Sequence, residues 1–184
     1  REDALRTPEA AFEGLPDWSG HSRWWTDLLG AVGLRVHAHD TGPEDEPSAT
    51  LWVHGAGGWS LGWRDAVVAA LQARPGRHIV PDLPGFGRSD KPKKEAFHQI
   101  STHANCLHAL CQRLGLTQVQ LVGAPDVQGL LQALRALAPD TYTVSAVQTP
   151  TALPAAWRDA PYPDKGYRAG PRALARMAAA GQGD

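Results

Sequence analysis

Hydrophobic and polar positions along the chain follow two spacings, one typical of strands and one typical of helices. Five short apolar segments rich in β-branched residues lie at residues 33–40, 49–55, 118–124 and 142–147 and at the start of 78–92. Amphipathic segments with apolar residues at helical spacing lie between most of them, at residues 63–76, 101–116 and 127–140. The alternation predicts an α/β domain with a mostly parallel sheet flanked by helices.

The helical segments carry boundary signals. The first ends in Pro-Gly, a pair that typically follows a helix. Ser101 or Thr102 is placed to cap the second. Residues 149–167 show no strand pattern and are predicted as a loop, and an alanine-rich helix is predicted over residues 171–180, with Pro171 in its first turn.

Length and composition indicate a single soluble globular domain. The chain has 184 residues, of which 42% are hydrophobic, and a formal net charge of −1. This balance argues against disorder and against a general attraction to anionic membranes or nucleic acid, so no nucleic-acid partner is predicted. No apolar run approaches the roughly 20 residues needed to cross a bilayer, and no signal segment opens the chain, so we expect a cytoplasmic protein.

Cysteine and histidine spacing does not indicate a metal centre. Cys106 and Cys111 are too few and wrongly spaced for a disulfide framework or a four-ligand zinc site. His37 and His39 share one face of a predicted strand, where a metal ion would need at least one further ligand. We therefore predict no metal and no cofactor.

Six segments of the chain form a recognisable series: LRTPEAAFEGLPDW, GLRVHAHDTGP, WVHGAGGWS, PDLPGFGRSDKP, ALCQRLGLTQVQLVGAPDVQG and APYPDKGYRAG. Together they resemble the haloalkane dehalogenases of the α/β-hydrolase superfamily. The strand-HG and PDLPGFGRSD elements occur throughout that superfamily, whereas the RTP segment and the late APYPD segment point to this branch. The resemblance covers nearly the whole chain, in order, and implies an α/β-hydrolase core.

The segment LVGAPDVQG contains the candidate nucleophile, Asp126, between a buried strand and a helix. The resemblance implies that a strained turn at this position presents the aspartate, which in the dehalogenases attacks an sp³ carbon. The resulting alkyl-enzyme ester is then hydrolysed by a water that a histidine activates. A role as the N-cap of the following helix is the alternative for Asp126.

Several departures from the family pattern bear on that nucleophile. The family holds the departing halide with a tryptophan after the nucleophile and with a polar side chain after HG, and this chain has Val127 and Ala56 there. Their backbone N–H groups remain candidates for an oxyanion-type hole. Gln148 falls where some relatives place the acid that orients the histidine, and all eight histidines precede Asp126, although the family's catalytic histidine follows its nucleophile.

The resemblance also implies that two parts of the family's structure are missing. A helical cap normally follows the strand that ends here at Val147, yet only about ten residues separate that strand from APYPDKGY. The last two strands of the family's sheet are expected to be absent. We therefore predict one shortened domain over residues 1–184, with a core over 1–150 and a remnant of the cap exit and C-terminal helix over 151–184.

Two surfaces are candidates for partner binding. Loss of the last strands would leave backbone groups unpaired along the predicted strand Tyr142–Val147, an edge that suits a strand from a protein partner or a second copy. Arg168, Arg172 and Arg176 recur every four residues, which predicts a positive helix stripe near the C-terminus, where the macrodipole favours cations. That stripe is either a solvated face or a docking surface for an acidic partner.

Three functions of different classes remain open. The leading prediction is a degenerate hydrolase domain that acts as a non-catalytic structural or interaction component of a complex. The second is a hydrolase, acting on carbon–halogen or related ester bonds, that uses Asp126 with a histidine and an acid outside these residues. The third is a small-molecule binding module in which Asp126 is only a hydrogen-bond acceptor.

Overall fold

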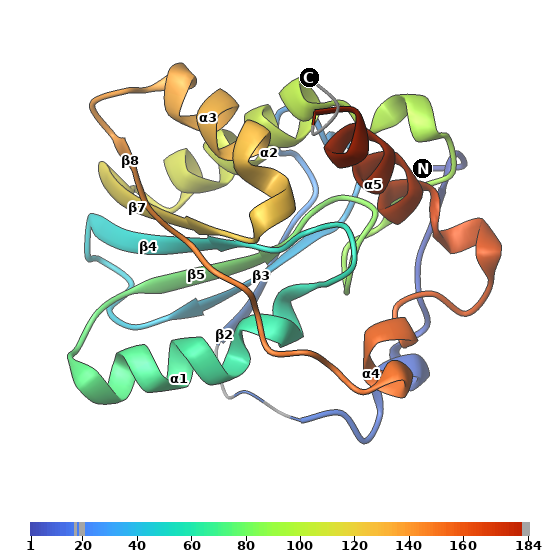
Figure 1. Ribbon diagram of the computed structural model, residues 1–184, viewed down its shortest axis with the longest axis horizontal. Helices are drawn as coiled ribbons and strands as arrows, with labels where there is room; N and C mark the ends of the chain where they lie inside the picture. The colour runs from blue at the N-terminus through green and yellow to red at the C-terminus, as the bar shows by residue number, and fades with distance from the viewer. Residues whose placement is uncertain (17, 19–20, 182–184) are drawn as a thin grey trace.

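The computed structural model describes residues 1–16, 18 and 21–181. Its main sheet has the strand order β2-β3-β5-β4-β7-β8 (Figure 1). The strands are β2 (His21–Trp25), β3 (Val36–Thr41), β4 (Ser48–Val53), β5 (His78–Asp82), β7 (Gln118–Gly123) and β8 (Tyr142–Val147). The last four run parallel, and β2 and β3 pair antiparallel, which confirms the predicted α/β class and mostly parallel sheet. A separate antiparallel pair joins β1 (Ala4–Leu5) to β6 (Lys91–Pro92).

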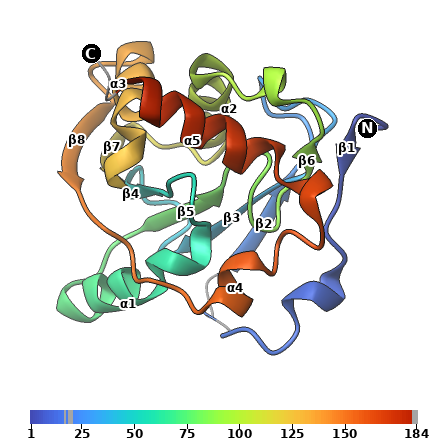
Figure 2. The same cartoon turned by 45° about the vertical axis from the view of Figure 1, so that its right-hand side comes forward.

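Helices cover both faces of the main sheet. α1 (Arg64–Ala73) lies on one face, and α2 (Ile100–Arg113) and α3 (Gln128–Leu137) lie on the other (Figure 1). α5 (Ala169–Gly181) crosses near α2 and α3, and the short α4 (Ala155–Asp159) precedes it in the chain (Figure 2). Single 3₁₀ turns are η1 (Glu9–Phe12), η2 (Ser60–Trp63), η3 (Glu95–Phe97), η4 (Pro125–Val127) and η5 (Lys165–Tyr167).

The structure has strands and helices at the positions that the periodicity predicts, and it adds the short pair β1 and β6 and three further differences. β2 was not predicted, because most of its side chains are exposed at the sheet edge and the segment HSRWW does not alternate cleanly. The cap of α2 was wrong: the helix begins one residue before Ser101, and its N-cap, Gln99, makes no side-chain capping bond. Residues 149–167, expected as loop, contain α4 and η5. The predicted C-terminal segment 151–184 extends past the described residues, since 182–184 lie outside them.

A row of buried apolar side chains fixes the register of the central strands. Leu51 of β4 lies opposite Ile79 of β5 and Leu121 of β7, and all three are fully buried. Burial of each stabilises the fold by about 1.5–3 kcal/mol. The same register sets Val53 beside Gly123, so β4 and β7 end together and their following loops meet at one edge of the sheet.

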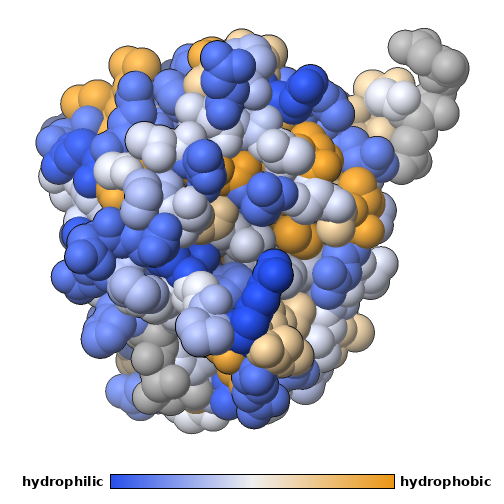
Figure 3. All heavy atoms as spheres, turned by 90° about the vertical axis from the view of Figure 1, so that its left-hand side faces the viewer, coloured by the Kyte–Doolittle hydropathy of each residue, from blue (hydrophilic) through white to orange (hydrophobic). Residues whose placement is uncertain are grey.

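The opposite edge of the sheet is formed by the amino ends of the parallel strands. Figure 3 shows this side of the molecule, where hydrophilic side chains predominate and hydrophobic ones form small separate groups. The loops that carry the candidate nucleophile lie at the other, carboxyl edge, which is the usual position of ligand sites in α/β sheets.

A buried ion pair ties the antiparallel strands to the segment that precedes β5. Arg77 donates from Nε to Oδ1 of Asp40 at 3.0 Å and from Nη2 to Oδ2 at 2.9 Å. Both side chains are 1% exposed. Arg23 of β2 also donates to Asp40 Oδ2, at 2.9 Å. A bidentate ion pair of this kind offsets the free-energy cost of burying the carboxylate of Asp40.

Replacement of Arg77 by methionine is expected to lower the free energy of unfolding by about 3 kcal/mol, because Asp40 then stays buried without its bidentate partner. Arg113 is the control, since it donates to Asp27 at 2.7 Å on the exposed surface. Arg113→Met should lower the free energy of unfolding by less than about 1 kcal/mol. Urea denaturation measures both, and equal small losses would contradict the assignment.

Candidate functional site

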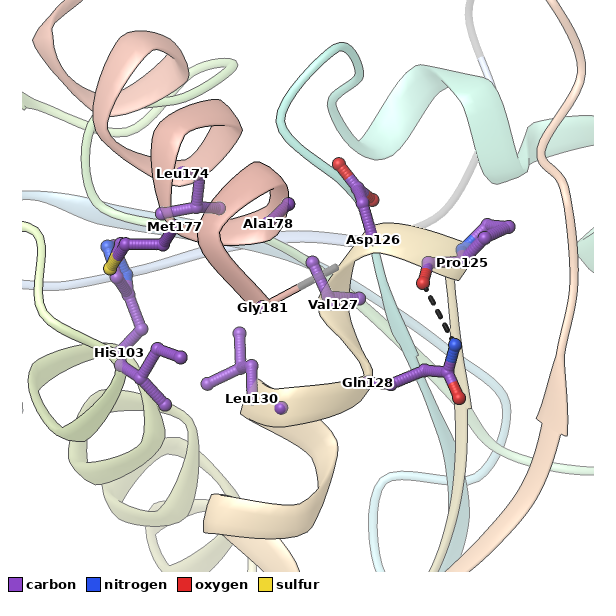
Figure 4. A pocket seen from close by; sticks show the side chains of 12 residues that line it. His103, Pro125, Asp126, Val127, Gln128, Leu130, Leu174, Met177, Ala178 and Gly181 are labelled. Carbon is purple, nitrogen blue, oxygen red and sulfur yellow. Dashed lines mark hydrogen bonds between the residues drawn. The ribbon is translucent and has the colours of Figure 1, made fainter. Parts of the chain in front are cut away.

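Asp126 lies in the connection between β7 and α3, as predicted. β7 ends at Gly123, the 3₁₀ turn η4 spans Pro125–Val127, and α3 follows at once from Gln128. Figure 4 shows Asp126 in this turn, which lies at the sheet edge where β4 and β7 end. The strand-turn-helix arrangement therefore brings the carboxylate to the edge where the family resemblance placed a nucleophile.

The turn is not strained, contrary to prediction. Among the described residues, none other than glycine has a positive φ, so Asp126 does not adopt a left-handed conformation. Ala124 is extended, with φ −63° and ψ 157°, as the residue before a proline usually is. Pro125 then sets its own φ near −65°, which starts a right-handed 3₁₀ turn. The proline thus explains why the strained elbow is absent.

The carboxylate of Asp126 is held by the loop that follows β4. The backbone N–H of Ala56 donates to Asp126 Oδ2 at 3.0 Å. Gly55 allows this approach, since a Cβ at that position would lie 2.1 Å from Asp126 Oδ1. The structure therefore brings together two of the predicted site residues, Ala56 and Asp126, through the backbone of the first.

The predicted two-donor oxyanion hole is not formed. The N–H of Val127 donates within the turn, to the carbonyl oxygen of Ala124 at 3.2 Å. Its side chain is buried and apolar, so Val127 contributes no donor. Gln148 follows β8 directly, and its N–H donates to Gly123 O at 2.9 Å. Gln148 is thus at the correct edge of the sheet, but its amide carries no charge to orient a histidine.

His54 is the imidazole nearest in the chain to the loop that holds Asp126, and it has a structural role. Its Nδ1 pairs with the carbonyl oxygen of Gly55 at 2.9 Å, and its Nε2 accepts the N–H of Leu83 at 3.1 Å. Burial lowers the pKa of His54, which keeps the ring neutral. With both nitrogens engaged, the ring has none free to activate a water over Asp126.

An apolar cavity of about 310 Å³ lies beside Asp126, between α2, α3 and α5 (Figure 4). Its lining includes Ile100, His103, Val127, Leu130, Leu174 and Met177. The carboxylate of Asp126 points away from His103 and Leu130 (Figure 4). The cavity is therefore mainly hydrophobic, with the acid at its rim.

His103 does not serve Asp126 as a base. Its Nε2 lies 3.2 Å from Nδ1 of His98, and the two rings are stacked. Burial, reinforced by the neighbouring imidazoles, lowers the pKa of His103 to about 3. His98 and His103 therefore form a neutral, stacked pair behind the cavity, which is a structural role.

The predicted arginine stripe is paired within the chain. Arg172 donates to Glu95 Oε1 at 2.9 Å, and Arg176 donates to the other oxygen of Glu95. Arg168 lies 3.4 Å from Asp159 and precedes the start of α5. The stripe therefore lies toward the amino end of α5, so the predicted support from the macrodipole was wrong. Arg172 and Arg176 instead attach α5 to η3, and Arg168 pairs with the last residue of α4.

A fully buried carboxylate, Asp82, was not singled out from the sequence. It accepts the N–H groups of Ser60 at 2.8 Å and Arg88 at 3.1 Å, and Nδ1 of His37 lies 2.8 Å from its Oδ2. Burial alone would raise the pKa of Asp82, but the hydrogen bond and charge of His37 hold it well below the usual range. Its position directly after an apolar strand, in PDLPGFG, was the available signal.

Two findings hold for the described part of the chain. In residues 1–16, 18 and 21–181, no helix is both long and apolar enough to cross a membrane. Within the same residues, no three metal-ligating side chains are grouped closely enough to hold an ion. His37 and His39 do share a face, with ring centroids 4.6 Å apart, but they lack a third ligand of this kind.

Comparison with known proteins agrees with this architecture. The family model described as alpha/beta hydrolase fold matches residues 51–124. A haloalkane dehalogenase of Psychrobacter cryohalolentis is 36% identical over 118 residues, which are 64% of this chain and 38% of that protein. Another, from Mycolicibacterium paratuberculosis, is 29% identical over 214 residues, covering 94% of this chain and 70% of that protein. The tetrameric haloalkane dehalogenase DpaA of Paraglaciecola agarilytica has a TM-score of 0.82 at 26% identity, covering 95% of this chain and 71% of that one.

The second of these matches indicates an internal shortening. It extends over 214 residues, whereas 94% of the 184 residues here is about 173, so about 40 positions have no counterpart within the matched part of this chain. In the structure, only residues 148–154 separate β8 from α4. This connection is where the sequence predicted the loss of a cap.

Gly55→Ala is expected to lower the free energy of unfolding by about 1–3 kcal/mol, because the added methyl group collides with the carboxylate of Asp126. Gly57→Ala is the matched control, since a Cβ there meets nothing within 4 Å. Its unfolding free energy should stay within about 1 kcal/mol of the unsubstituted chain. Chemical denaturation compares them, and equal effects of the two substitutions would argue against the close contact.

Proposed function

We propose that this chain, a haloalkane dehalogenase-like protein with the α/β-hydrolase fold, acts as a non-catalytic structural or interaction component. The observation that supports this most directly is the donor set around Asp126. The side chains at the halide-holding positions are those of Ala56 and Val127, and neither can donate. The single backbone donor, Ala56 N–H, is already bonded to the carboxylate.

The chemistry of dehalogenation explains why this donor set matters. A carboxylate oxygen would form a bond to an sp³ carbon as the carbon–halogen bond breaks, and the halide would leave with a full negative charge. Loss of one positioned donor from such a developing anion typically costs about 10²–10³ in rate. With no side-chain donor there, Asp126 serves better as an anchor for the loop at Gly55 than as a nucleophile.

The outer edge of β8 is the surface through which we expect such a component to act. β8 pairs with β7 on one side, and in the described part of the chain no strand pairs with its other side. Thr143, Ser145 and Val147 are exposed along it. Backbone groups on an open edge form hydrogen bonds to an added strand, which favours a second copy or a protein partner there.

Small-molecule binding is a second candidate, and the cavity beside Asp126 favours it. Its volume of about 310 Å³ is at the lower end of the range for ligand pockets, and its lining is mainly apolar with one acid at the rim. In this alternative Asp126 accepts a hydrogen bond from the ligand without chemical change. A hydrolase that draws its histidine from outside these residues is the third candidate.

Incubation with 1,2-dibromoethane is expected to leave the intact mass of the chain unchanged. An active nucleophile without a base would instead trap the alkyl ester, adding one alkyl group to Asp126 and releasing bromide. Mass spectrometry and bromide release are measured for the unsubstituted chain, for Asp126→Asn, and for an authentic haloalkane dehalogenase as positive control. An adduct that Asp126→Asn abolishes would reject the non-catalytic proposal, and repeated bromide release would establish a hydrolase.

The chain is expected to self-associate through β8, as measured by light scattering during size-exclusion chromatography. Val147, 45% exposed on β8, is the test position, and a lysine there should weaken association at least about tenfold, because edge charges oppose strand addition. Val68→Lys on α1 is the matched control, because Val68 is similarly exposed. A well-folded monomer, or equal weakening by both substitutions, would contradict the edge as the interface.

A further inference from the structure

A serine, a histidine and an aspartate form a hydrogen-bonded series on the antiparallel side of the main sheet. Ser22 Oγ lies 3.0 Å from Nε2 of His37, and Nδ1 of the same ring lies 2.8 Å from Oδ2 of Asp82. The three residues come from β2, β3 and β5, which are consecutive in the sheet. Strand pairing sets His37 directly opposite Asp82, so the arrangement is built into the sheet register.

The hydrogen-bond partners assign the proton positions in this series. Asp82 accepts two backbone N–H groups and stays ionised, so it offers His37 only acceptor oxygens. With Asp82 offering only acceptor oxygens, His37 donates from Nδ1 to Asp82. In the tautomer whose Nε2 carries no proton, Nε2 accepts the O–H of Ser22, which is the arrangement that activates a hydroxyl nucleophile.

Burial separates the base from water while leaving the hydroxyl accessible. The side chains of His37 and Asp82 are 0% exposed, whereas Ser22 is exposed. His39 packs edge-on against His37, and burial, with the nearby His37, lowers the pKa of His39 to about 3. His39 thus stays neutral and adds no positive charge beside the base.

Trp24 supplies an apolar surface next to the hydroxyl. It is two residues from Ser22 on the same strand, so the two side chains share a face. Its ring centroid lies 4.6 Å from that of His37, Arg35 stacks on it at 4.2 Å, and 37% of the residue remains exposed. A flat, partly exposed indole beside a nucleophile suits an aromatic group on the reacting molecule.

We propose that Ser22 is a nucleophile toward activated aryl esters and related phosphonyl donors, with His37 as general base and Asp82 as the residue that positions the base. Ser22 Oγ forms a bond to the carbonyl carbon while its proton moves to His37 Nε2. The carbon–oxygen bond to the aryl group breaks, and the aryloxide leaves with that proton. Water then attacks the acyl-serine carbonyl and gives a proton to His37 Nε2, and Ser22 Oγ leaves with that proton as the carboxylic acid is released. The site is separate from Asp126, so it adds an activity elsewhere in the chain and leaves the non-catalytic assignment to the Asp126 site.

A fluorophosphonate reagent tests this on the intact chain, because it forms a stable Oγ–phosphorus bond and expels fluoride. Peptide mass spectrometry is expected to find the adduct on Ser22, and Ser22→Ala should abolish it. Ser145→Ala is the matched control, since Ser145 is an exposed strand serine whose hydroxyl donates to Gln120. That variant should label Ser22 at the unchanged rate.

The role of the base is tested with His37→Asn, whose side-chain amide retains a donor toward Asp82 but removes Nε2. The labelling rate of Ser22 is expected to fall about 100-fold. The thermal midpoint shows whether the variant is folded. If it is not, the ratio of adduct at Ser22 to adduct at Ser145 in the unsubstituted chain decides. A ratio near one, or labelling of Ser22 that is unchanged in folded His37→Asn, would overturn the proposal.

Discussion

The contact between the carboxylate of Asp126 and the backbone N–H of Ala56 is the constraint on which the site depends. It requires β4 and β7 to end in register, and a residue without a Cβ at Gly55. The first condition follows from the buried row across the central strands, because a slip of either strand would separate the two loops. The interior packing of the sheet and the geometry of the site are therefore one arrangement.

That contact also changes what the carboxylate can do. In a dehalogenase-like pocket, free donors are needed where the halide leaves, yet here the available backbone donor faces the acid itself, and the next N–H closes the turn through Ala124. Pro125 contributes to the same outcome, since its fixed φ favours a 3₁₀ turn over a strained elbow. A single proline thus gives the connection local stability without the strain that presents a nucleophile.

Much of the fold follows from the sequence alone, because the spacing of apolar residues distinguishes strands from helices and shows which face of each element is buried. β2 could not be predicted in this way, because an edge strand buries few side chains and β2 is stabilised by its pairing with β3. The site was predicted in position but not in detail. Ala56 and Asp126 are 70 residues apart, so only the folded chain shows that Ala56 meets the acid while Val127 does not. The pairing of Arg172 with Glu95 was equally non-local.

Asp82, which is buried, and Asp126, which is half-buried, both lie at the carboxyl edge of the sheet. They differ in whether a histidine ring nitrogen contacts the carboxylate. Asp126 has a backbone donor but no ring nitrogen, because His54 uses both of its nitrogens on the adjacent loops. Asp82 has His37, whose second nitrogen faces a hydroxyl at the surface. Proton transfer requires a base with one nitrogen oriented and the other open to the reacting group. In the described part of the chain that condition is met at the antiparallel strands, so the acid that the family resemblance singles out is not the acid best equipped for proton transfer.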